Sequence, residues 1–248
     1  MRAVMLAAGV GHRLQLSEPL AKILLTFDGE TLLKRHLRIL AFCGVRHLDL
    51  VVGYRADEVL AEIDGADTDL RVTAHMNEDY TLGSIASLWA ARSVLAGGDP
   101  VFFMDADVLY DHRLLVRLIE SEHRNCFLLD RKVGPGDDPI KLCMTDGLLV
   151  DIHKHPKLPH EWRGEWIGFA RFEPDIAAKI AKAAGRYMAS GCHLAIYEDA
   201  FRDVLIAERP GTFGVEDVTG LPWVEIDFPE DLEVAKNEVL PQLEAIPA

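Results

Sequence analysis

The sequence has no apolar run that approaches the roughly 20 residues of a membrane-spanning helix, and its N-terminus lacks a basic stretch followed by an apolar one and a cleavage site. We therefore expect a cytoplasmic protein without a membrane partner. Cysteine is also scarce: four cysteines are scattered over 248 residues, at Cys43, Cys126, Cys143 and Cys192. No Cys-x-x-Cys or mixed Cys/His spacing occurs, which argues against a zinc site and a disulfide framework.

Positive charge is in short supply. The chain has 26 Lys and Arg residues against 40 Asp and Glu residues, so its formal net charge is −14. Because the nucleic-acid backbone is bound by clustered Lys and Arg, this balance argues against a nucleic-acid partner. A small anionic ligand is still compatible with the charge, since a local loop with a divalent metal reverses the field within one cleft.

Two common phosphate-binding motifs are absent. The dinucleotide fingerprint G-x-G-x-x-G needs a third glycine where Leu14 stands, and the Gly-Lys-Ser/Thr of a P-loop does not occur. The apolar run Arg2–Leu6 nevertheless has strand length and ends in a loop of small residues that exposes backbone N–H groups. Because the cationic residues Arg13 and Lys22 follow, this loop is predicted to bind a nucleoside triphosphate. The alternative is an ordinary strand-to-helix turn. The predicted nucleotide-binding residues here are Leu6, Ala7, Ala8, Gly9, Gly11, Arg13 and Lys22.

The first half of the chain alternates between strand and helix patterns. Strands are predicted at 2–6, 47–52, 70–74 and 100–104, and helices at 32–40, 57–63 and 85–95. This order predicts an α/β fold with a Rossmann-like, mostly parallel sheet and helices on both faces. Gly83 and Ser84 precede the 85–95 helix, where they either touch the base or ribose or simply cap the helix.

Two carboxylates follow the central apolar strand. Asp105 and Asp107 lie two residues apart at the end of the run Pro100–Met104, so they point to the same side of the sheet edge where ligands bind. Carboxylates together with phosphate oxygens are the ligands that Mg²⁺ prefers, which predicts a Mg²⁺ site. Helix capping by Asp107 or Asp111 is the structural alternative.

Shorter strand-like segments begin at Asn125. Strands are expected at 126–129, 141–144, 148–153 and 167–172, and Asp146-Gly147 is a hairpin turn signal. We expect an antiparallel lid over residues 131–172, embedded in a single domain that spans 1–248. Helices at 174–184 and 189–206, a strand at 223–227 and a helix from Pro229 complete the pattern.

Three motifs, taken together, resemble the sugar-phosphate nucleotidyltransferase superfamily. They are Leu6-Ala-Ala-Gly-x-Gly-x-Arg with a downstream lysine, Asp105-Ala-Asp107, and Glu225-Ile-Asp227-x-Pro-Glu-Asp-Leu. The segments Ser-Ile-Ala-Ser-Leu and Gly-Glu-Trp-Ile-Gly-Phe resemble choline-phosphate and phosphonate cytidylyltransferases most. The resemblance implies a nucleotidyltransferase fold of the GT-A-like type and a Mg²⁺-dependent attack of an acceptor oxygen on the α-phosphorus of a nucleoside triphosphate, with release of pyrophosphate.

The same resemblance assigns roles to individual residues. Gly9, Gly11 and Arg13 would hold the triphosphate, and Lys22 would bridge the donor and acceptor phosphates. Such enzymes usually place proline directly before this lysine, whereas Ala21 stands there in this sequence. The expected catalytic residues are Lys22, Arg13 and Asp107; the expected metal ligands are Asp107 and Asp227, with Asp105 and Glu225 in reserve.

The acceptor is expected to be a small phosphate or phosphonate ester with a cationic amine, such as phosphocholine or aminoethylphosphonate. Aromatic faces and a carboxylate attract ammonium groups, which points to Trp162, Glu165 and Trp166 in the lid, with Tyr197 and Glu198 as further candidates. Alternatively, the two tryptophans only pack the lid onto the sheet. The preferred function is transfer of CMP from CTP. The alternatives are a sugar- or polyol-phosphate nucleotidyltransferase, a metal-dependent glycosyltransferase and a catalytically silent nucleotide sensor, and a homodimer is left open.

Overall fold

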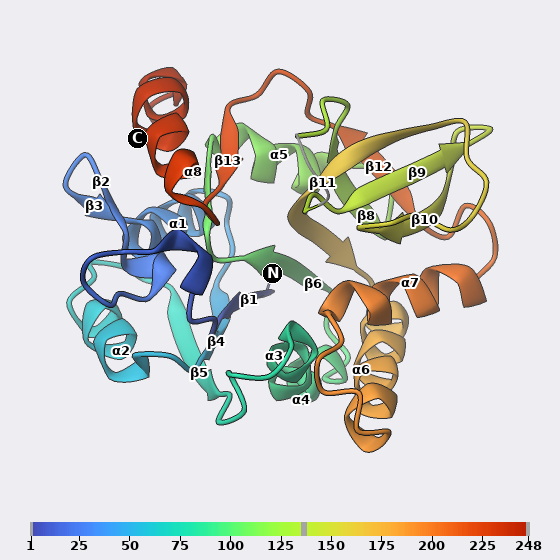
Figure 1. Ribbon diagram of the computed structural model, residues 1–248, viewed down its shortest axis with the longest axis horizontal. Coiled ribbons are helices and arrows are strands. Elements are labelled where there is room, and N and C mark those ends of the chain that lie inside the picture. The colour runs from blue at the N-terminus through green and yellow to red at the C-terminus, as the bar shows by residue number, and fades with distance from the viewer. Residues whose placement is uncertain (1, 135–137, 247–248) are drawn as a thin grey trace.

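A mostly parallel sheet forms the centre of the computed structural model, which describes residues 2–134 and 138–246. Within these residues the main sheet has nine strands, and its main path is β10-β9-β11-β6-β1-β4-β5 (Figure 1). The parallel strands are β1 (Arg2–Ala7), β4 (His47–Val52), β5 (Arg71–Met76) and β6 (Val101–Asp105). The antiparallel part contains β8 (Cys126–Asp130), β9 (Lys141–Thr145), β10 (Leu148–His153) and β11 (Trp162–Phe172), and β12 (Gly214–Asp217) runs parallel to β8.

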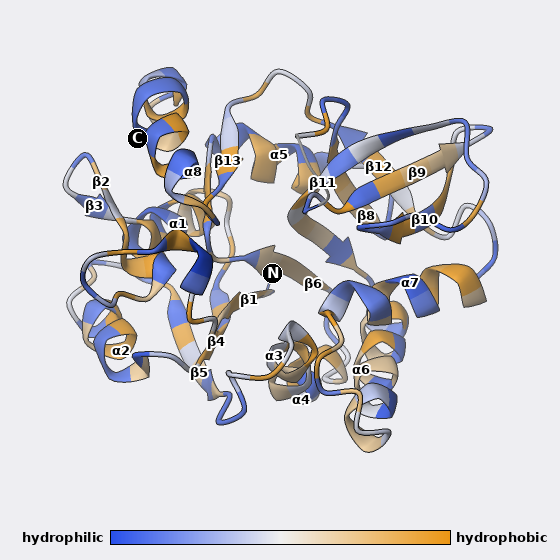
Figure 2. Ribbon diagram, viewed as in Figure 1, coloured by the Kyte–Doolittle hydropathy of each residue, from blue (hydrophilic) through white to orange (hydrophobic). Residues whose placement is uncertain are grey.

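Helices cover both faces of this sheet, which explains why its central strands β1 and β6 are apolar at most positions. Met5 of β1 packs into one core and Val4 into the other, because successive side chains point to opposite faces. The first core is covered by α1 (Leu32–Phe42), α2 (Ala56–Asp64) and α5 (His112–Glu120). The second is covered by α3 (Ser84–Ala90), α4 (Arg92–Leu95), α6 (Pro174–Ala189) and α7 (Tyr197–Ala207). Figure 2 shows both hydrophobic and hydrophilic residues on these helices.

A small two-stranded sheet joins the C-terminal part of the chain to the end of β6. Strand β13 (Trp223–Glu225) pairs with β7 (Val108–Tyr110), and the amide of Ile226 donates to the carbonyl of Asp107 over 2.9 Å. This pairing brings the residues after β6 next to the residues after β13, although they are far apart in sequence. The remaining short elements are β2 (Thr26–Phe27), β3 (Glu30–Thr31), α8 (Pro229–Val234), a π-helical turn at Ala235–Val239, and 3₁₀ turns at His12–Leu14, Lys22–Leu24 and Leu240–Gln242.

The expected fold class is confirmed, and so is the hairpin at Asp146-Gly147, where both residues have positive φ. The helix expected at 189–206 is wrong in its first part, because α6 continues to Ala189 and α7 begins only at Tyr197. The intervening segment contains Gly191 in a left-handed conformation, and its carbonyls bond to the start of α3: the amide of Gly83 donates to the His193 carbonyl over 2.7 Å. These tertiary bonds replace the missing helical ones.

Two further boundaries differ from the sequence prediction. The strand expected at 167–172 begins at Trp162, since it pairs with β9 over its first residues and with β6 over its last. Gly168, at φ 84°, lies in the bend between the two partners. The helix expected at 85–95 divides into α3 and α4 at Ala91. Residues 135–137 of the expected lid lie outside the described residues.

No helix in the described parts of the chain combines the length and the apolarity that a bilayer crossing requires.

Candidate active site

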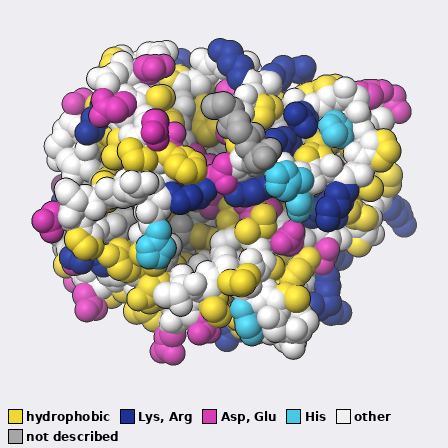
Figure 3. Space-filling view, viewed as in Figure 1, with side chains coloured by type: hydrophobic (Ala, Val, Ile, Leu, Met, Phe, Trp, Pro, Cys, Tyr) yellow, Lys and Arg dark blue, Asp and Glu magenta, His cyan; other side chains and the backbone are white. Residues whose placement is uncertain are grey.

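A cavity of about 450 Å³ opens at the carboxyl ends of β1 and β6, where α/β sheets bind their ligands. Figure 3 shows Lys and Arg side chains meeting Asp and Glu side chains near the middle of this face. The cavity is lined by the loop after β1, the ends of β6 and β13, the start of α7, and residues that flank β9 and β10. The lining residues include Leu6, Ala7, Ala8, Gly9, Gly11, Arg13, Lys22, Tyr80, Ser84, Ser87, Asp105, Asp107, Asp138, Lys154, Tyr197, Glu198, Glu225 and Asp227.

The glycine loop lies directly against the stem of Lys22. A Cβ on Gly11 would approach Lys22 Cγ and Cε to 3.0 Å, and Gly11 also has a left-handed φ of 67°. Both features favour glycine at this position. Buried Leu14 and Ala21 anchor the two short 3₁₀ turns that follow, so the chain directs Lys22 into the cavity without the usual preceding proline.

Lys22 bridges two carboxylates. Its Nζ lies 2.9 Å from Asp107 Oδ2 and also donates to Asp227 Oδ1. The ammonium-bearing side chain is only 14% exposed, and burial alone would lower its pKa. The two aspartates more than offset that effect, so the pKa of Lys22 lies above its ordinary value and the residue is a cation.

Three carboxylates converge beside this lysine. Oxygen atoms of Asp107, Glu225 and Asp227 all lie within 4.8 Å of one another. Burial raises the pKa of Asp227, Lys22 lowers it in part, and Asp107 raises it further. The pKa of Glu225 is raised by burial of its carboxyl group and by the same two aspartates, although the side chain as a whole is exposed. Three mutually repelling oxygen donors fit a hard divalent cation such as Mg²⁺.

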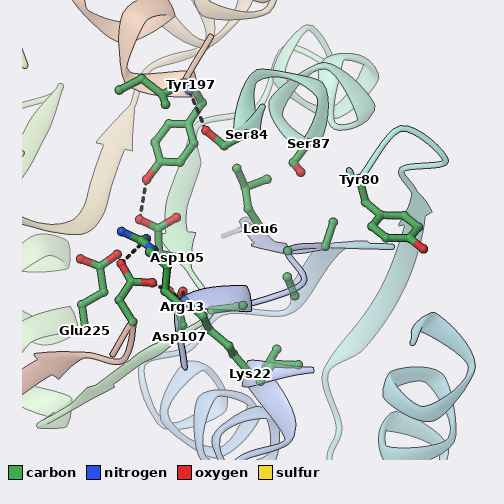
Figure 4. Close-up of a pocket in the computed structure, with 18 of the residues that line it drawn as sticks. Leu6, Arg13, Lys22, Tyr80, Ser84, Ser87, Asp105, Asp107, Tyr197 and Glu225 are labelled. Carbon is green, nitrogen blue, oxygen red and sulfur yellow. Dashed lines mark hydrogen bonds and ion pairs between the residues drawn. The ribbon is translucent and has the colours of Figure 1, made fainter. Parts of the chain in front are cut away.

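Asp105 makes a different contact. Its Oδ2 accepts a hydrogen bond of 2.5 Å from the Tyr197 hydroxyl, as Figure 4 shows. A Cβ on Gly168 would approach this oxygen to 2.6 Å, so the absence of a side chain there makes room for the carboxylate. Burial and then Asp107 raise the pKa of Asp105. Of the two reserve ligands expected from the sequence, the structure brings Glu225 into the three-carboxylate group and links Asp105 to α7.

Arg13 connects the glycine loop to the antiparallel part of the sheet. Its guanidinium lies 2.6 Å from Asp227 Oδ2 and 2.5 Å from Asp138 Oδ2. Asp138 in turn accepts from Lys154 Nζ over 2.6 Å. Sequence reasoning missed both Asp138 and Lys154; their only signal was their position just outside the strands of the expected lid.

The opposite wall of the cavity is less charged. Tyr80, Ser84 and Ser87 lie across from Lys22 and the aspartates (Figure 4). Ser84 Oγ accepts from the Tyr197 amide over 3.0 Å and therefore does not cap its own helix. Gly83 does not line the cavity: a Cβ there would approach the Ala195 carbonyl to 2.3 Å, so this glycine allows close packing of α3 against the 193–195 segment.

Three of the expected acceptor residues lie elsewhere. Trp162 stacks under the Arg131 guanidinium at 4.4 Å, and Glu165 accepts from the Gly134 amide over 2.5 Å. Trp166 is 3% exposed, packs against Phe103 and donates its indole N–H to the Phe169 carbonyl, so it offers no face to a ligand. None of these three lines the cavity, because the segment is the first half of β11 and not a loop over the cleft. Tyr197 and Glu198 do line it.

Known proteins share this architecture and sequence pattern. CMP-5′-(3-aminopropyl)phosphonate synthase of Streptomyces rubellomurinus is 27% identical over 259 residues, which cover 98% of this chain and 40% of that protein. The chain thus spans less than half the length of that relative. CTP:phosphoglutamine cytidylyltransferase of Campylobacter jejuni is 21% identical, with 94% of this chain and 98% of that protein covered. The structure of the inositol-1-phosphate CTP transferase from T. maritima has the same fold, with a TM-score of 0.75, 19% identity and 98% of both chains covered.

The resemblance to nucleotidyltransferases that the sequence motifs indicate is therefore confirmed. The model of the MobA-like NTP transferase domain matches residues 3–163, from the first strand through the glycine loop, Asp105-Ala-Asp107 and the β9–β10 hairpin. This chain belongs to the family of MobA-like NTP transferase domains.

Proposed function

We propose that the protein transfers CMP from CTP to a small phosphate or phosphonate acceptor and releases pyrophosphate. The observation that carries this proposal is the placement of Lys22 and Arg13 between a glycine loop and three carboxylates, in one cavity. Nucleotidyl transfer needs little covalent help from a protein; it needs positioned phosphates and neutralised oxygen charge, and these residues provide both.

The residues divide into groups by what they can bind. Backbone amides of the glycine loop and the Arg13 guanidinium would hold the triphosphate, because both are suited to phosphate oxygens. Asp107, Asp227 and Glu225 would hold Mg²⁺, which when bound supplies charge neutralisation at the phosphate oxygens. Lys22 would lie between the attacking and α-phosphoryl oxygens as the new P–O bond forms and the bond to pyrophosphate breaks.

Lys154 is the candidate for the acceptor's phosphate or phosphonate group. The residue lines the cavity, and among the described residues its Nζ forms an ion pair with Asp138. A partly exposed ion pair of this kind exchanges readily for a more strongly charged anion. The acceptor oxygen would then enter on the side of the cavity opposite the nucleobase.

Ser87 supports cytosine over uracil. Its Oγ accepts from the buried Asn77 side-chain amide over 3.0 Å, which leaves the hydroxyl proton to be donated into the cavity. Cytosine presents an acceptor at N3 where uracil presents an N–H, so a donor here favours CTP. The two sequence relatives, a CMP-5′-(3-aminopropyl)phosphonate synthase and a CTP:phosphoglutamine cytidylyltransferase, support the same choice.

Pyrophosphate release with a panel of four nucleoside triphosphates tests the proposal. Phosphonate, phosphate-ester and sugar-phosphate acceptors are each supplied with Mg²⁺, and the proposal expects acceptor-dependent pyrophosphate with CTP. Ser87→Ala should narrow the preference for CTP over UTP, whereas Ser93→Ala, at an exposed position on the neighbouring helix α4, should not. Sugar phosphates as the best acceptors, hydrolysis of nucleotide sugars, or tight nucleotide binding without turnover would favour the three alternative functions in turn.

A further inference from the structure

Carboxylates outnumber cations in the cavity. The described lining residues contribute six Asp or Glu side chains and three Lys or Arg side chains. Lys22 and Arg13 contact Asp107, Asp227 or Asp138, and Lys154 contacts Asp138 as well. Glu225 belongs to the three-carboxylate group, and Asp105 accepts from Tyr197. Among the described residues, Glu198 is the lining carboxylate that remains: it forms no ion pair with a Lys or Arg side chain, and it interacts with its own backbone amide and the Tyr197 side chain.

Glu198 is buried at the start of α7. Its side chain is 8% exposed, and its Oε2 has no hydrogen-bond partner in the described parts of the chain. Burial raises the pKa of Glu198 to about 7, an effect that its own backbone amide, Lys154 and the Tyr197 side chain offset only in part. A buried carboxylate oxygen without a donor is costly, so its retention beside a ligand cavity points to a ligand that supplies the donor.

We propose that Glu198 binds a primary ammonium group of the acceptor, which makes the substrate class zwitterionic aminoalkyl phosphonates or aminoalkyl phosphate esters. This inference rests on the proposed nucleotidyl transfer, and it adds how the protein recognises the two ends of the acceptor. Lys154 binds the phosphonate or phosphate group, and Glu198 binds the ammonium group. Once Lys154 turns to the acid group, Glu198 has no other nearby cation among the cavity-lining side chains of the described residues.

The unpaired Oε2 of Glu198 should favour a primary ammonium group over a trimethylammonium or a hydroxyl group. A trimethylammonium group carries the charge but has no N–H, so it leaves Oε2 without a donor. A hydroxyl group supplies a donor but leaves the carboxylate's charge uncompensated in a buried site. A protonated amine, such as the primary ammonium group, supplies both through a charge-assisted hydrogen bond.

The experiment compares three probes of matched length: 2-aminoethylphosphonate, its trimethylammonium analogue and 2-hydroxyethylphosphonate. Their kcat/KM values are measured with CTP and Mg²⁺ for the wild type, for Glu198→Gln and for Glu120→Gln, a charge-removing control at an exposed position at the end of α5. We expect Glu198→Gln to lower kcat/KM for the primary amine by about 10- to 100-fold, the range for a lost hydrogen bond to a charged group. The kcat/KM for the hydroxyl analogue should not fall, because the substitution removes the charge that this analogue leaves uncompensated. Thermal unfolding of the variant checks that it is folded.

A binding measurement tests the ammonium site independently of the proposed transfer reaction. Calorimetry with Mg²⁺ and a non-hydrolysable CTP analogue measures acceptor affinity even if no acceptor turns over with any nucleotide, the outcome that would reject the proposed transfer. Tighter binding of 2-aminoethylphosphonate than of both analogues, abolished by Glu198→Gln and kept by Glu120→Gln, supports the ammonium site. Equal affinities for the three probes, or an unchanged preference in Glu198→Gln, would overturn it.

Discussion

Replacing Lys22 by methionine should reveal how strongly the carboxylate group depends on this cation. The substitution keeps the length of the side chain but leaves Asp107, Asp227 and Glu225 facing one another without it. Lys22 is 14% exposed and Asp227 is 10% exposed, so water screens the loss poorly. Removing one partner of a buried pair costs about 3 to 5 kcal/mol, and we expect the lower end here because Asp107 is 23% exposed.

A loss of about 3 kcal/mol in the free energy of unfolding corresponds to a decrease in Tm of roughly 6 to 12 °C for a chain of this length. Thermal unfolding in the presence of a chelator measures it. Lys34→Met is the matched control, since Lys34 pairs with Glu62 over 3.1 Å at a surface position where its side chain is 39% exposed. An exposed pair of this kind contributes at most about 1 kcal/mol.

The pH dependence of the Tm difference between wild type and Lys22→Met tests whether the effect is electrostatic. The pKa of Lys22 is raised by its partners, so its stabilising contribution is fully present at all pH values below its usual value near 10, provided that the partners are ionised. The pKa of Asp227 is already raised above its usual value near 4, and it must rise further without Lys22. The Tm difference between wild type and Lys22→Met should therefore be largest at neutral pH and should shrink on acidification as the carboxylates take up protons. A loss that equals the Lys34→Met control at neutral pH, or one that is constant down to about pH 4, would refute this electrostatic explanation.

Three kinetic predictions complement the first. Lys22→Met should lower kcat more than it raises KM for CTP, because a cation between the reacting oxygens acts mainly in the transition state; a change in KM alone in steady-state kinetics would make Lys22 a simple triphosphate clamp. Asp107→Ala should lower kcat by at least about 100-fold, the scale for loss of a preorganised electrostatic group, and near-normal turnover would reject its assignment as a metal ligand. His36 is fully buried and its Nε2 lies 2.9 Å from the carbonyl of Ala106, between the two aspartates, so His36→Leu should raise the Mg²⁺ concentration for half-maximal rate by about 10- to 100-fold. His36→Gln, which can still donate to that carbonyl, should recover most of this loss, and equal effects of the two substitutions would argue against a positioning role.

The sequence alone was sufficient to predict a part of the site when all of its residues lie in one short segment. The glycine loop is such a case: a strand, small residues and two cations occur within the first 22 residues, and Lys22 lies in the cavity as expected. Asp107 follows the apolar strand β6 closely and lines the same cavity. Asp227 lies far from it in sequence, and only the resemblance to nucleotidyltransferases, and then the pairing of β7 with β13, brings the two together.

Features that depend on tertiary contacts could not be predicted in the same way. The carboxylate of Asp138 contacts Arg13 from a segment more than a hundred residues away, and no local pattern marks that contact. Trp166 was a reasonable aromatic ligand by composition, yet its place in β11 turns it into the core against Phe103. Glu198 was one candidate among several, and what distinguishes it, an unpaired buried oxygen, is visible only in the folded protein.

The central claim is that this cavity joins a nucleoside monophosphate to an acceptor through a new phosphoanhydride bond. Phosphorus NMR of the wild-type protein with CTP, Mg²⁺ and 2-aminoethylphosphonate tests it most directly. The account predicts a pair of coupled product signals, one from a phosphonate and one from a phosphate, that grow together with free pyrophosphate and are absent with Asp107→Ala. Pyrophosphate without the coupled pair, or the coupled pair formed equally well by Asp107→Ala, would contradict it.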